Sequence, residues 1–229
     1  LLAVSNVDTN PEGSVATLKL EIEEGSGRVF MDSFPLSKID TQISTRFAKE
    51  VACNFLEADC SNYDFFYTIR ANSALIGGPS AGAAITILTI SVLEDLPIDE
   101  HTSITGTINT GGIIGPVGSV AAKAQSAANA GVRQVLIPRY TVVNMSNFTG
   151  YEDEYGVEVV EVSHISEALY YFTGVDYTNY EEVNISESYI DTMGQISIEL
   201  CDRAQELSKV YDVDENVSDF PVSRECLVS

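Results

Sequence analysis

The stretch GGPSAGAAITILTISVLEDL, residues 77–96, joins a Gly-Gly-Pro turn to a long apolar run, with Ser80 between the two. Glycine permits a tight turn and proline suits the first turn of a helix, so the stretch predicts a turn followed by a helix that Ser80 opens. The apolar run ends at Glu94, short of the roughly 18–20 residues that a membrane span needs. Ser80 is therefore either a helix cap or a nucleophile, and this stretch alone does not decide between them.

The composition indicates a folded and strongly acidic protein. Of its 229 residues, 45% are hydrophobic, which is enough for a substantial core. The chain has 34 acidic and 12 basic residues, for a net charge of −22. We expect no nucleic acid partner, because phosphate groups are bound by clustered lysines and arginines. The acidic surface either keeps the protein soluble or reflects adaptation to high salt or to acid.

Alternating strand and helix patterns predict a mixed α/β domain followed by a helical tail. Strands are expected at 1–7, 14–24, 28–34, 63–71, 103–109, 112–118, 133–140 and 157–162. Helices are expected at 40–58, 80–95, 119–131, 165–174 and 185–211. In the first helix we expect Asp40 to be the N-cap. One face of that helix is expected to carry Ile43, Phe47, Val51 and Phe55.

The cysteines and asparagines give weaker signals. Cys53, Cys60, Cys201 and Cys226 lack the CxxC spacing of a zinc site, and we expect no metal or other cofactor. Cys53 and Cys60 bracket the end of a predicted helix, so they are either disulfide-bonded or free. Sequons occur at Asn144, Asn147, Asn184 and Asn216. They slightly favour an extracytoplasmic or membrane-anchored protein over a cytoplasmic one.

A serine nucleophile needs a base, and histidine is one candidate. The chain has two, His101 and His164, neither of which lies in an HExxH pattern. GPSAG at 78–82 matches the G-x-S-x-G pattern, which with His164 and an aspartate would form a Ser-His-Asp hydrolase. The segment SALIG before it is at best a short strand for such a turn. The sequence contains no G-x-x-x-x-G-K-[ST], so this chain has no ATP-binding loop of its own.

Lysine is the other candidate base. Lys123 is the only lysine between Lys49 and Lys209, and it lies on a predicted alanine-rich helix. No acidic residue follows or precedes it at three or four positions. It is either an ordinary helix lysine that reaches solvent or a partly buried one. Burial would lower its pKa, as a lysine general base requires, although the negative net charge acts in the opposite direction.

Several motifs resemble the proteolytic domain of the Lon proteases. They are GGPSAGAA at 77–84, TG at 105–106, GPVGSVAAKAQSAANAG at 115–131 and VLIP at 135–138. GRVFMDSFPLSKIDTQISTRFA at 27–48 further resembles a group of archaeal Lon-like proteins that lack the ATPase module. The resemblance implies an α/β (α+β) fold of mixed sheets with packed helices, the Lon proteolytic-domain fold, over residues 1–175. Residues 176–229 would form a C-terminal helical extension.

The resemblance also implies a serine–lysine dyad. By motif matching, Ser80 is the nucleophile, Lys123 is the base and Thr105 is the threonine that assists the lysine. The backbone of the turn around the serine, namely Gly78, Pro79 and Ala81, is then the expected oxyanion hole.

The sequence departs from the Lon pattern at two positions. Gly77 stands where many Lon enzymes have an acidic residue, and Ala121 stands where they have a second lysine.

The function expected from the resemblance is a serine endopeptidase that cleaves unfolded proteins or peptides without ATP and without a cofactor. Its partner is a polypeptide substrate, and the sequence leaves open self-association and a membrane tether outside the given residues. Two alternatives remain: a Ser-His-Asp hydrolase or esterase, and a non-catalytic acidic surface or binding domain.

Overall fold

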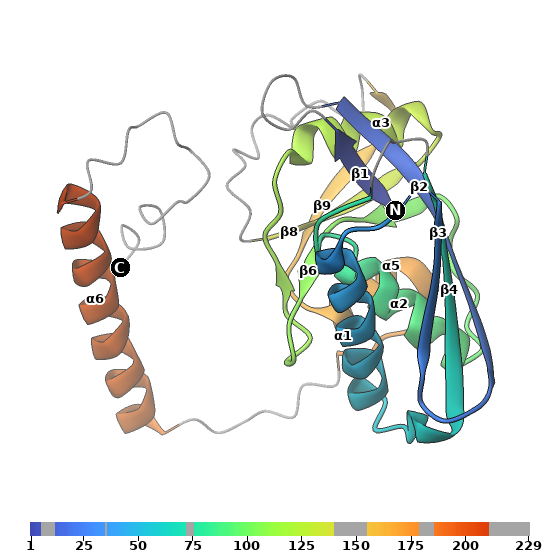
Figure 1. Cartoon of the computed structure of the whole chain (residues 1–229). Helices are drawn as coiled ribbons and strands as arrows, with labels where there is room; N and C mark the ends of the chain where they lie inside the picture. The colour runs from blue at the N-terminus through green and yellow to red at the C-terminus, as the bar shows by residue number, and fades with distance from the viewer. Residues whose placement is uncertain (6–11, 35, 72–75, 140–154, 179–185, 211–229) are drawn as a thin grey trace. The chain divides into compact units, whose positions relative to one another are not determined.

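The computed structural model describes residues 1–5, 12–34, 36–71, 76–139, 155–178 and 186–210 (Figure 1). The asparagines of the four sequons and the last fifteen residues lie outside these ranges. The chain forms two compact units, Leu1–Thr178 and Asn179–Ser229. Every residue of the predicted site belongs to the first unit.

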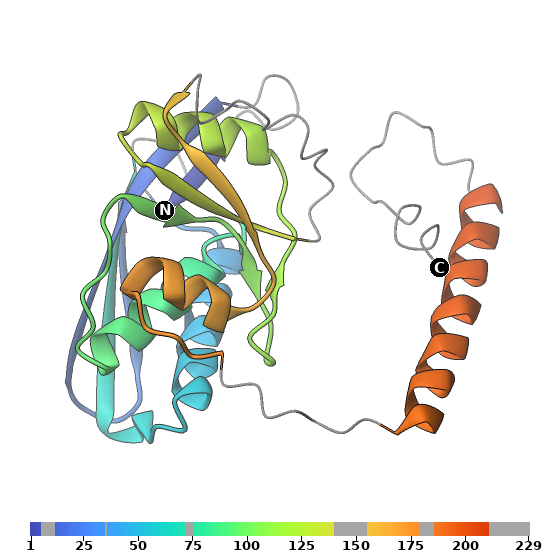
Figure 2. The ribbon, with the colours of Figure 1, turned by 180° about the vertical axis from the view of Figure 1, so that it is seen from behind.

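A four-stranded sheet forms one side of the first unit. Its strands are β1 (Leu2–Ser5), β2 (Glu12–Glu24), β3 (Val29–Phe34) and β4 (Tyr63–Ala71), in the order β1-β2-β4-β3. β1 and β4 run antiparallel to β2, whereas β3 runs parallel to β4. The helices α1 and α2 lie along one face of this sheet, and α5 lies on the far side of α2 (Figures 1 and 2).

The main core lies between this sheet and three helices, α1 (Ile39–Phe55), α2 (Gly82–Leu93) and α5 (Ile165–Thr173). α2 is buried on nearly all sides, because its apolar and small residues leave no polar face. This helix is the predicted apolar run, and it starts two residues after Ser80 rather than at Ser80.

A second, smaller sheet is parallel throughout. It consists of β5 (Thr102–Ile104), β8 (Gln134–Pro138) and β9 (Glu158–Val162), in the order β5-β8-β9. α3 (Val120–Asn129) packs against it and against β1 in a separate apolar cluster. α3 ends at Asn129 with Ala130 as its C-cap, and the predicted stop residue Gly131 follows in the left-handed region at φ +79°. The mixed α/β fold class is therefore confirmed.

The predicted strand at 103–109 is broken in two. β5 ends at Ile104, and the chain resumes as β6 (Thr107–Ile108), which forms an antiparallel hairpin with β7 (Ile114–Gly115). The break falls at Thr105-Gly106, the TG motif. Of the predicted strand at 112–118, only β7 forms a strand, and Ile113 before it makes an isolated antiparallel bridge to His164.

The predicted start of α1 was wrong. Its N-cap is Lys38 rather than Asp40, and Asp40 lies in the first turn. Of the four residues expected along one face of α1, Val51 is buried and Phe47 and Phe55 pack against the main core, whereas Ile43 is 60% exposed. The buried side of α1 also carries small and polar residues: Thr41, Ser44, Thr45, Ala48 and Ala52. Such residues allow two helix backbones to approach closely.

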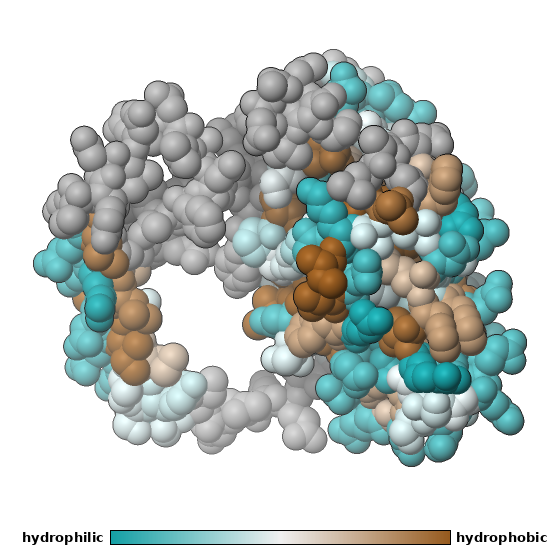
Figure 3. Space-filling model, in the orientation of Figure 1, coloured by the Kyte–Doolittle hydropathy of each residue, from teal (hydrophilic) through white to brown (hydrophobic). Residues whose placement is uncertain are grey.

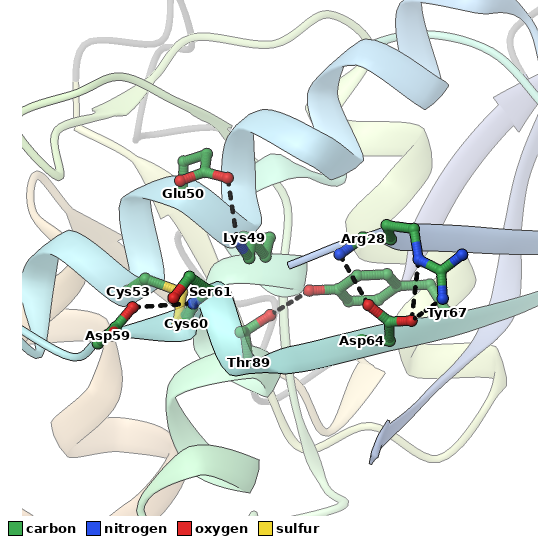
Figure 4. Close-up of polar contacts among 10 residues, drawn as sticks. All are labelled: Arg28, Lys49, Glu50, Cys53, Asp59, Cys60, Ser61, Asp64, Tyr67 and Thr89. Atoms are coloured by element: carbon green, nitrogen blue, oxygen red, sulfur yellow. Dashed lines mark hydrogen bonds and ion pairs between the residues drawn. A yellow bond between two sulfur atoms is a disulfide. The ribbon is translucent and has the colours of Figure 1, made fainter. Parts of the chain in front are cut away.

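Two covalent or polar links tie the end of α1 and the sheet to the core (Figure 4). A disulfide joins Cys53 to Cys60, at the start of the short 3₁₀ helix η1 (Cys60–Asn62). The Tyr67 hydroxyl lies 2.7 Å from the Thr89 Oγ1, which links β4 to α2. Burial raises the pKa of Tyr67 far above its ordinary value.

Lys49 is a buried lysine on α1. Its Nζ donates to the Glu50 Oε1 at 3.0 Å (Figure 4). The same nitrogen lies 5.1 Å from the centre of the Phe65 ring. The ammonium therefore keeps both a carboxylate and an aromatic face as partners.

Asp64 fixes the turn between β2 and β3. Its carboxylate accepts from the Arg28 Nη2 at 2.6 Å and from the backbone N–H groups of Ser26 and Arg28 at 2.8 and 2.9 Å (Figure 4). The hydrogen bond from the Arg28 side chain is the largest cause that lowers the pKa of Asp64 to about 2. A residue with a Cβ at Gly25 would come within 2.2 Å of the Asp64 Cγ, so this turn requires glycine.

The second unit contains one described helix, α6 (Glu187–Val210). Exposed apolar side chains recur along it, and part of this stripe is visible as brown atoms in Figure 3. They include Tyr189, Ile190, Met193, Ile196, Leu200 and Leu207. Among the helices that the structure describes, none is both long enough and apolar enough to cross a membrane.

We predict that the Asp64 ion pair sets part of the acid stability. Because its pKa is lower in the folded protein than in the unfolded chain, the contribution is present above about pH 4 and is lost as the pH falls toward 2. Asp64→Asn should therefore reduce the loss of unfolding free energy toward low pH, as measured by urea unfolding between pH 2 and 6. The exposed pair Asp32–Arg70 supplies the control: Asp32→Asn should leave the series unchanged. Equal acid sensitivity of Asp64→Asn and the wild type would contradict the prediction.

Candidate active site

Ser80 lies in the turn that leads into α2. The N-cap of α2 is Ala81 and no side chain caps the helix, so Ser80 is not the helix cap. The turn is sharp, since Gly78 has φ +92°, in the left-handed region that favours glycine. Ser80 is half-buried, while Gly77 and Pro79 are exposed. The hydroxyl therefore sits on a constrained backbone at the edge of the core.

Lys123 is buried on α3, and only 3% of its surface is exposed. Its Nζ donates to the Thr105 Oγ1 at 3.1 Å. Burial lowers the pKa of Lys123 to about 8. In the part of the chain that the structure describes, no carboxylate forms an ion pair with it. Lys49 has the Glu50 carboxylate as a partner, whereas the side-chain partner of Lys123 is the Thr105 hydroxyl.

Gly106 links the lysine side of the site to the serine. Its N–H donates to the Ser80 carbonyl oxygen at 3.0 Å, and its own carbonyl accepts from the Ala83 N–H at 3.1 Å. The preceding residue, Thr105, donates its N–H to Leu136 of β8 at 3.1 Å. One dipeptide thus connects the turn of Ser80, the start of α2, the Lys123 side chain and the parallel sheet.

This contact explains why the strand breaks at 105–106. A Cβ at Gly106 would lie 2.4 Å from the Ile114 Cγ2 and 3.3 Å from the Ala83 Cβ, so only glycine allows the backbone to approach α2 this closely. In the sequence, TG stands out only as part of the motifs shared with the Lon family. The signal for Gly106 was the glycine that interrupts an otherwise regular strand pattern.

The expected oxyanion-hole residues differ in what they can donate. Pro79 has no N–H, and the Gly78 N–H already donates to the Asp40 Oδ2 at 3.1 Å. Among the described residues, the N–H groups of Ser80 and Ala81 have no recorded acceptor. These two donors lie just before the first turn of α2, where the helix dipole favours negative charge.

The two positions that depart from the Lon pattern also have defined surroundings. A Cβ at Gly77 would lie 2.7 Å from the Lys38 Cδ, so the stem of this lysine occupies the space beside the glycine. Ala121 is exposed on α3, next to the half-buried Ala122.

Neither histidine is available to Ser80. The His164 Nδ1 lies 2.8 Å from the Ser166 Oγ and accepts from the Ser166 N–H. His164 is thereby the N-cap of α5. Its Nε2 lies 2.8 Å from the Gly111 carbonyl oxygen. His101 is exposed, with its Nδ1 3.4 Å from the Gly131 carbonyl oxygen at the end of α3. A Ser-His-Asp arrangement around Ser80 is therefore not favoured.

Within the described ranges, no group of three or more His, Cys, Asp or Glu side chains could hold a metal ion. A hollow of about 600 Å³ between β3 and α1 is lined by side chains that include Arg28, Phe30 and Arg46. None of Ser80, Thr105 and Lys123 lines this hollow.

We predict that Lys123 makes the protein more stable as the pH rises. Its pKa is about 8 in the folded protein and about 10.5 in the unfolded chain, so between these values only the unfolded chain holds the proton. The free energy of unfolding should rise by up to about 3 kcal/mol across this interval. Lys123→Met should remove this rise in urea-unfolding series, whereas the exposed Lys19→Met should retain it. An equal rise in both variants would contradict the lowered pKa.

Comparisons with known proteins show which family this chain resembles. Residues 52–172, more than half of the chain, match the Lon protease (S16) C-terminal proteolytic domain. The archaeal Lon protease of Methanothermobacter thermautotrophicus is 35% identical over 111 residues, which are 48% of this chain and 17% of that protein. That of Halobacterium salinarum is 34% identical over 101 residues, 44% of this chain and 14% of that protein.

A bacterial relative gives a similar match. The Lon protease of Koribacter versatilis is 33% identical over 107 residues, 47% of this chain and 13% of that protein. The chain therefore spans less than a fifth of the length of each of these three relatives. The resemblance stated from the motifs is confirmed: this chain belongs to the family of the Lon protease (S16) C-terminal proteolytic domain.

Proposed function

We propose that this chain is a serine endopeptidase in which Ser80 is the nucleophile and Lys123 is the general base. The observation that carries the proposal is the buried Lys123, which is bonded to Thr105 and has its pKa lowered to about 8. A base with a pKa near the working pH has a useful unprotonated fraction and still holds a proton well enough to deliver it. Membership of the Lon proteolytic-domain family supports a peptidase.

The first chemical step is acylation. The neutral amine of Lys123 takes the proton from the Ser80 Oγ while that oxygen attacks the carbonyl carbon of a peptide bond. The resulting ammonium returns the proton to the leaving amine when the C–N bond breaks, which leaves an acyl-enzyme. A water molecule then attacks the ester, with Lys123 again acting as the base, and the Ser80 hydroxyl is restored.

Thr105 holds the lysine in the geometry that this step needs. The Nζ donates one hydrogen to the Thr105 Oγ1, which fixes the direction of the nitrogen lone pair. The backbone N–H of Thr105 in turn donates to the Leu136 carbonyl oxygen of β8. Thr105 thus has the orienting role of the third group in a catalytic triad.

The N–H groups of Ser80 and Ala81 form the oxyanion hole in this proposal. Both precede the first turn of α2, where backbone donors and the helix dipole stabilise the negative oxygen of the tetrahedral intermediate. This assignment narrows the expectation from sequence, because Pro79 has no N–H and that of Gly78 is occupied.

The substrate in this proposal is an unfolded polypeptide or a flexible peptide. In this proposal an extended chain approaches the half-buried Ser80 from the side of the exposed Gly77 and Pro79. The sequence has no ATP-binding loop, and we expect this chain to cleave without ATP.

We predict that the serine and the lysine are both essential. Ser80→Ala and Lys123→Met should each lower kcat/KM for a fluorogenic peptide by at least about a thousandfold. The reason is that a nucleophile and its base act as a unit, so the loss of either one removes the contribution of both. His164→Asn keeps a good N-cap on α5 and should retain the wild-type value. The assay is run on purified protein without ATP, with unfolded casein as a second substrate.

Two outcomes would overturn this assignment. If the Lys123→Met variant remains active and the His164→Asn variant is inactive, the Ser-His-Asp alternative is correct. If the wild type cleaves neither substrate and Ser80 reacts with no sulfonyl fluoride, the domain is a non-catalytic binding module.

We predict that activity rises with pH through the pKa of Lys123. Only the neutral amine can accept the proton, so kcat/KM should increase toward a midpoint of about pH 8 and level off above it. The measurement is a pH profile of peptide cleavage from pH 5 to 10. A midpoint near 6.5, the ordinary value of histidine, or a flat profile would contradict a lysine base.

A further inference from the structure

The turn before Ser80 is held by the first two turns of α1, and this contact is the subject of a further inference. The Asp40 Oδ2 accepts from the Gly78 N–H at 3.1 Å. The Thr41 Oγ1 lies 3.3 Å from the Gly78 carbonyl oxygen, to which it donates, and the Ser44 Oγ donates to the Pro79 carbonyl at 3.3 Å. Three side chains of one helix therefore reach two consecutive residues of the turn.

These contacts use every backbone polar group of Gly78 and Pro79. Gly78 has its N–H and its carbonyl engaged, and Pro79 has only a carbonyl, which also accepts from the Gly82 N–H at 3.0 Å. Backbone groups at the edge of a core need partners, and here α1 supplies most of them. The N–H groups of Ser80 and Ala81 are the next donors along the chain, and they remain without a recorded acceptor among the described residues.

Asp40 differs from the other two side chains in its charge and its place. Thr41 and Ser44 are buried and donate, whereas Asp40 is exposed and is the only acceptor of the three. Its Oδ1 accepts from the Thr41 N–H at 2.7 Å, so the carboxylate is itself fixed on α1. A charged acceptor makes a stronger hydrogen bond to an N–H than a neutral one does. The Gly78 N–H is thereby turned toward α1 and away from the open side of the turn.

We propose that Asp40 is a positioning residue for the nucleophile: it orients the turn at Gly78 so that the N–H groups of Ser80 and Ala81 face the substrate. This inference rests on the proposed function and deepens it. Asp40 touches neither the substrate nor Lys123 in this scheme, and it acts through the backbone of the turn. Losing it affects the chemical step, because the oxyanion donors and the Ser80 Oγ move together with that backbone.

The test compares Asp40→Ala with Asp40→Asn. The alanine variant lacks the acceptor, so kcat for a fluorogenic peptide should fall about ten- to a hundredfold, the size of effect that a small misplacement of reacting groups produces. KM should change little. The asparagine variant keeps an oxygen acceptor and should restore most of the lost kcat. Glu21→Ala, which removes an exposed carboxylate from β2, is the control for charge and should match the wild type.

Two further readouts separate positioning from a general loss of fold. The midpoint of the pH profile should stay at its wild-type value in Asp40→Ala, because the Lys123–Thr105 contact is untouched. Values of kcat are calculated per active molecule from titration with a sulfonyl fluoride, so that unfolded protein does not count.

The possible results are distinct. An unchanged kcat per active molecule in Asp40→Ala, with an active wild type, overturns this inference alone. A shifted pH midpoint, or an Asp40→Asn variant as impaired as Asp40→Ala, also overturns it. A wild type that neither cleaves peptides nor reacts at Ser80 overturns both this inference and the proposed function.

Discussion

The close approach of the Gly106 backbone to α2 is the constraint on which the site depends. Its N–H and carbonyl are bonded to Ser80 and Ala83, and a side chain at this position would collide with Ile114. The same approach ends β5 one residue before Thr105, whose hydroxyl accepts from Lys123. Two segments that are distant in sequence thus meet through a glycine. Any larger residue would separate the serine turn from the lysine helix.

The surrounding fold keeps this meeting point rigid. α2 is buried on nearly all sides and begins just after the serine, so the turn is attached to one of the best-packed elements of the core. α1 closes the other side of the turn through Asp40, Thr41 and Ser44. The disulfide at the end of α1 and the Tyr67–Thr89 hydrogen bond between β4 and α2 hold the same two helices and the sheet together. A preorganised backbone of this kind is what electrostatic stabilisation of a transition state requires.

Local sequence patterns predicted the elements better than their junctions. The apolar run of α2 and the alanine-rich α3 with its final glycine follow from periodicity and composition, and the isolated lysine pointed to Lys123. The break at Gly106 was missed, because SITGTIN alternates like one continuous strand. The N-cap of α1 was misplaced for a related reason: the Asp40 carboxylate bonds to a backbone group 38 residues away. Such long-range partners leave no local pattern, and they are where the site is assembled.

The two buried lysines, Lys49 and Lys123, have different polar surroundings. The Lys49 Nζ lies beside the Glu50 carboxylate and the Phe65 ring. The Lys123 Nζ instead donates to the Thr105 hydroxyl, and burial favours the neutral amine of Lys123. A neutral amine is also a nucleophile toward electrophiles such as aldehydes and activated esters. Only 3% of the Lys123 surface is exposed, so a reagent dissolved in water has little access to this amine. The burial that lowers the pKa of Lys123 therefore also shields its amine from indiscriminate modification.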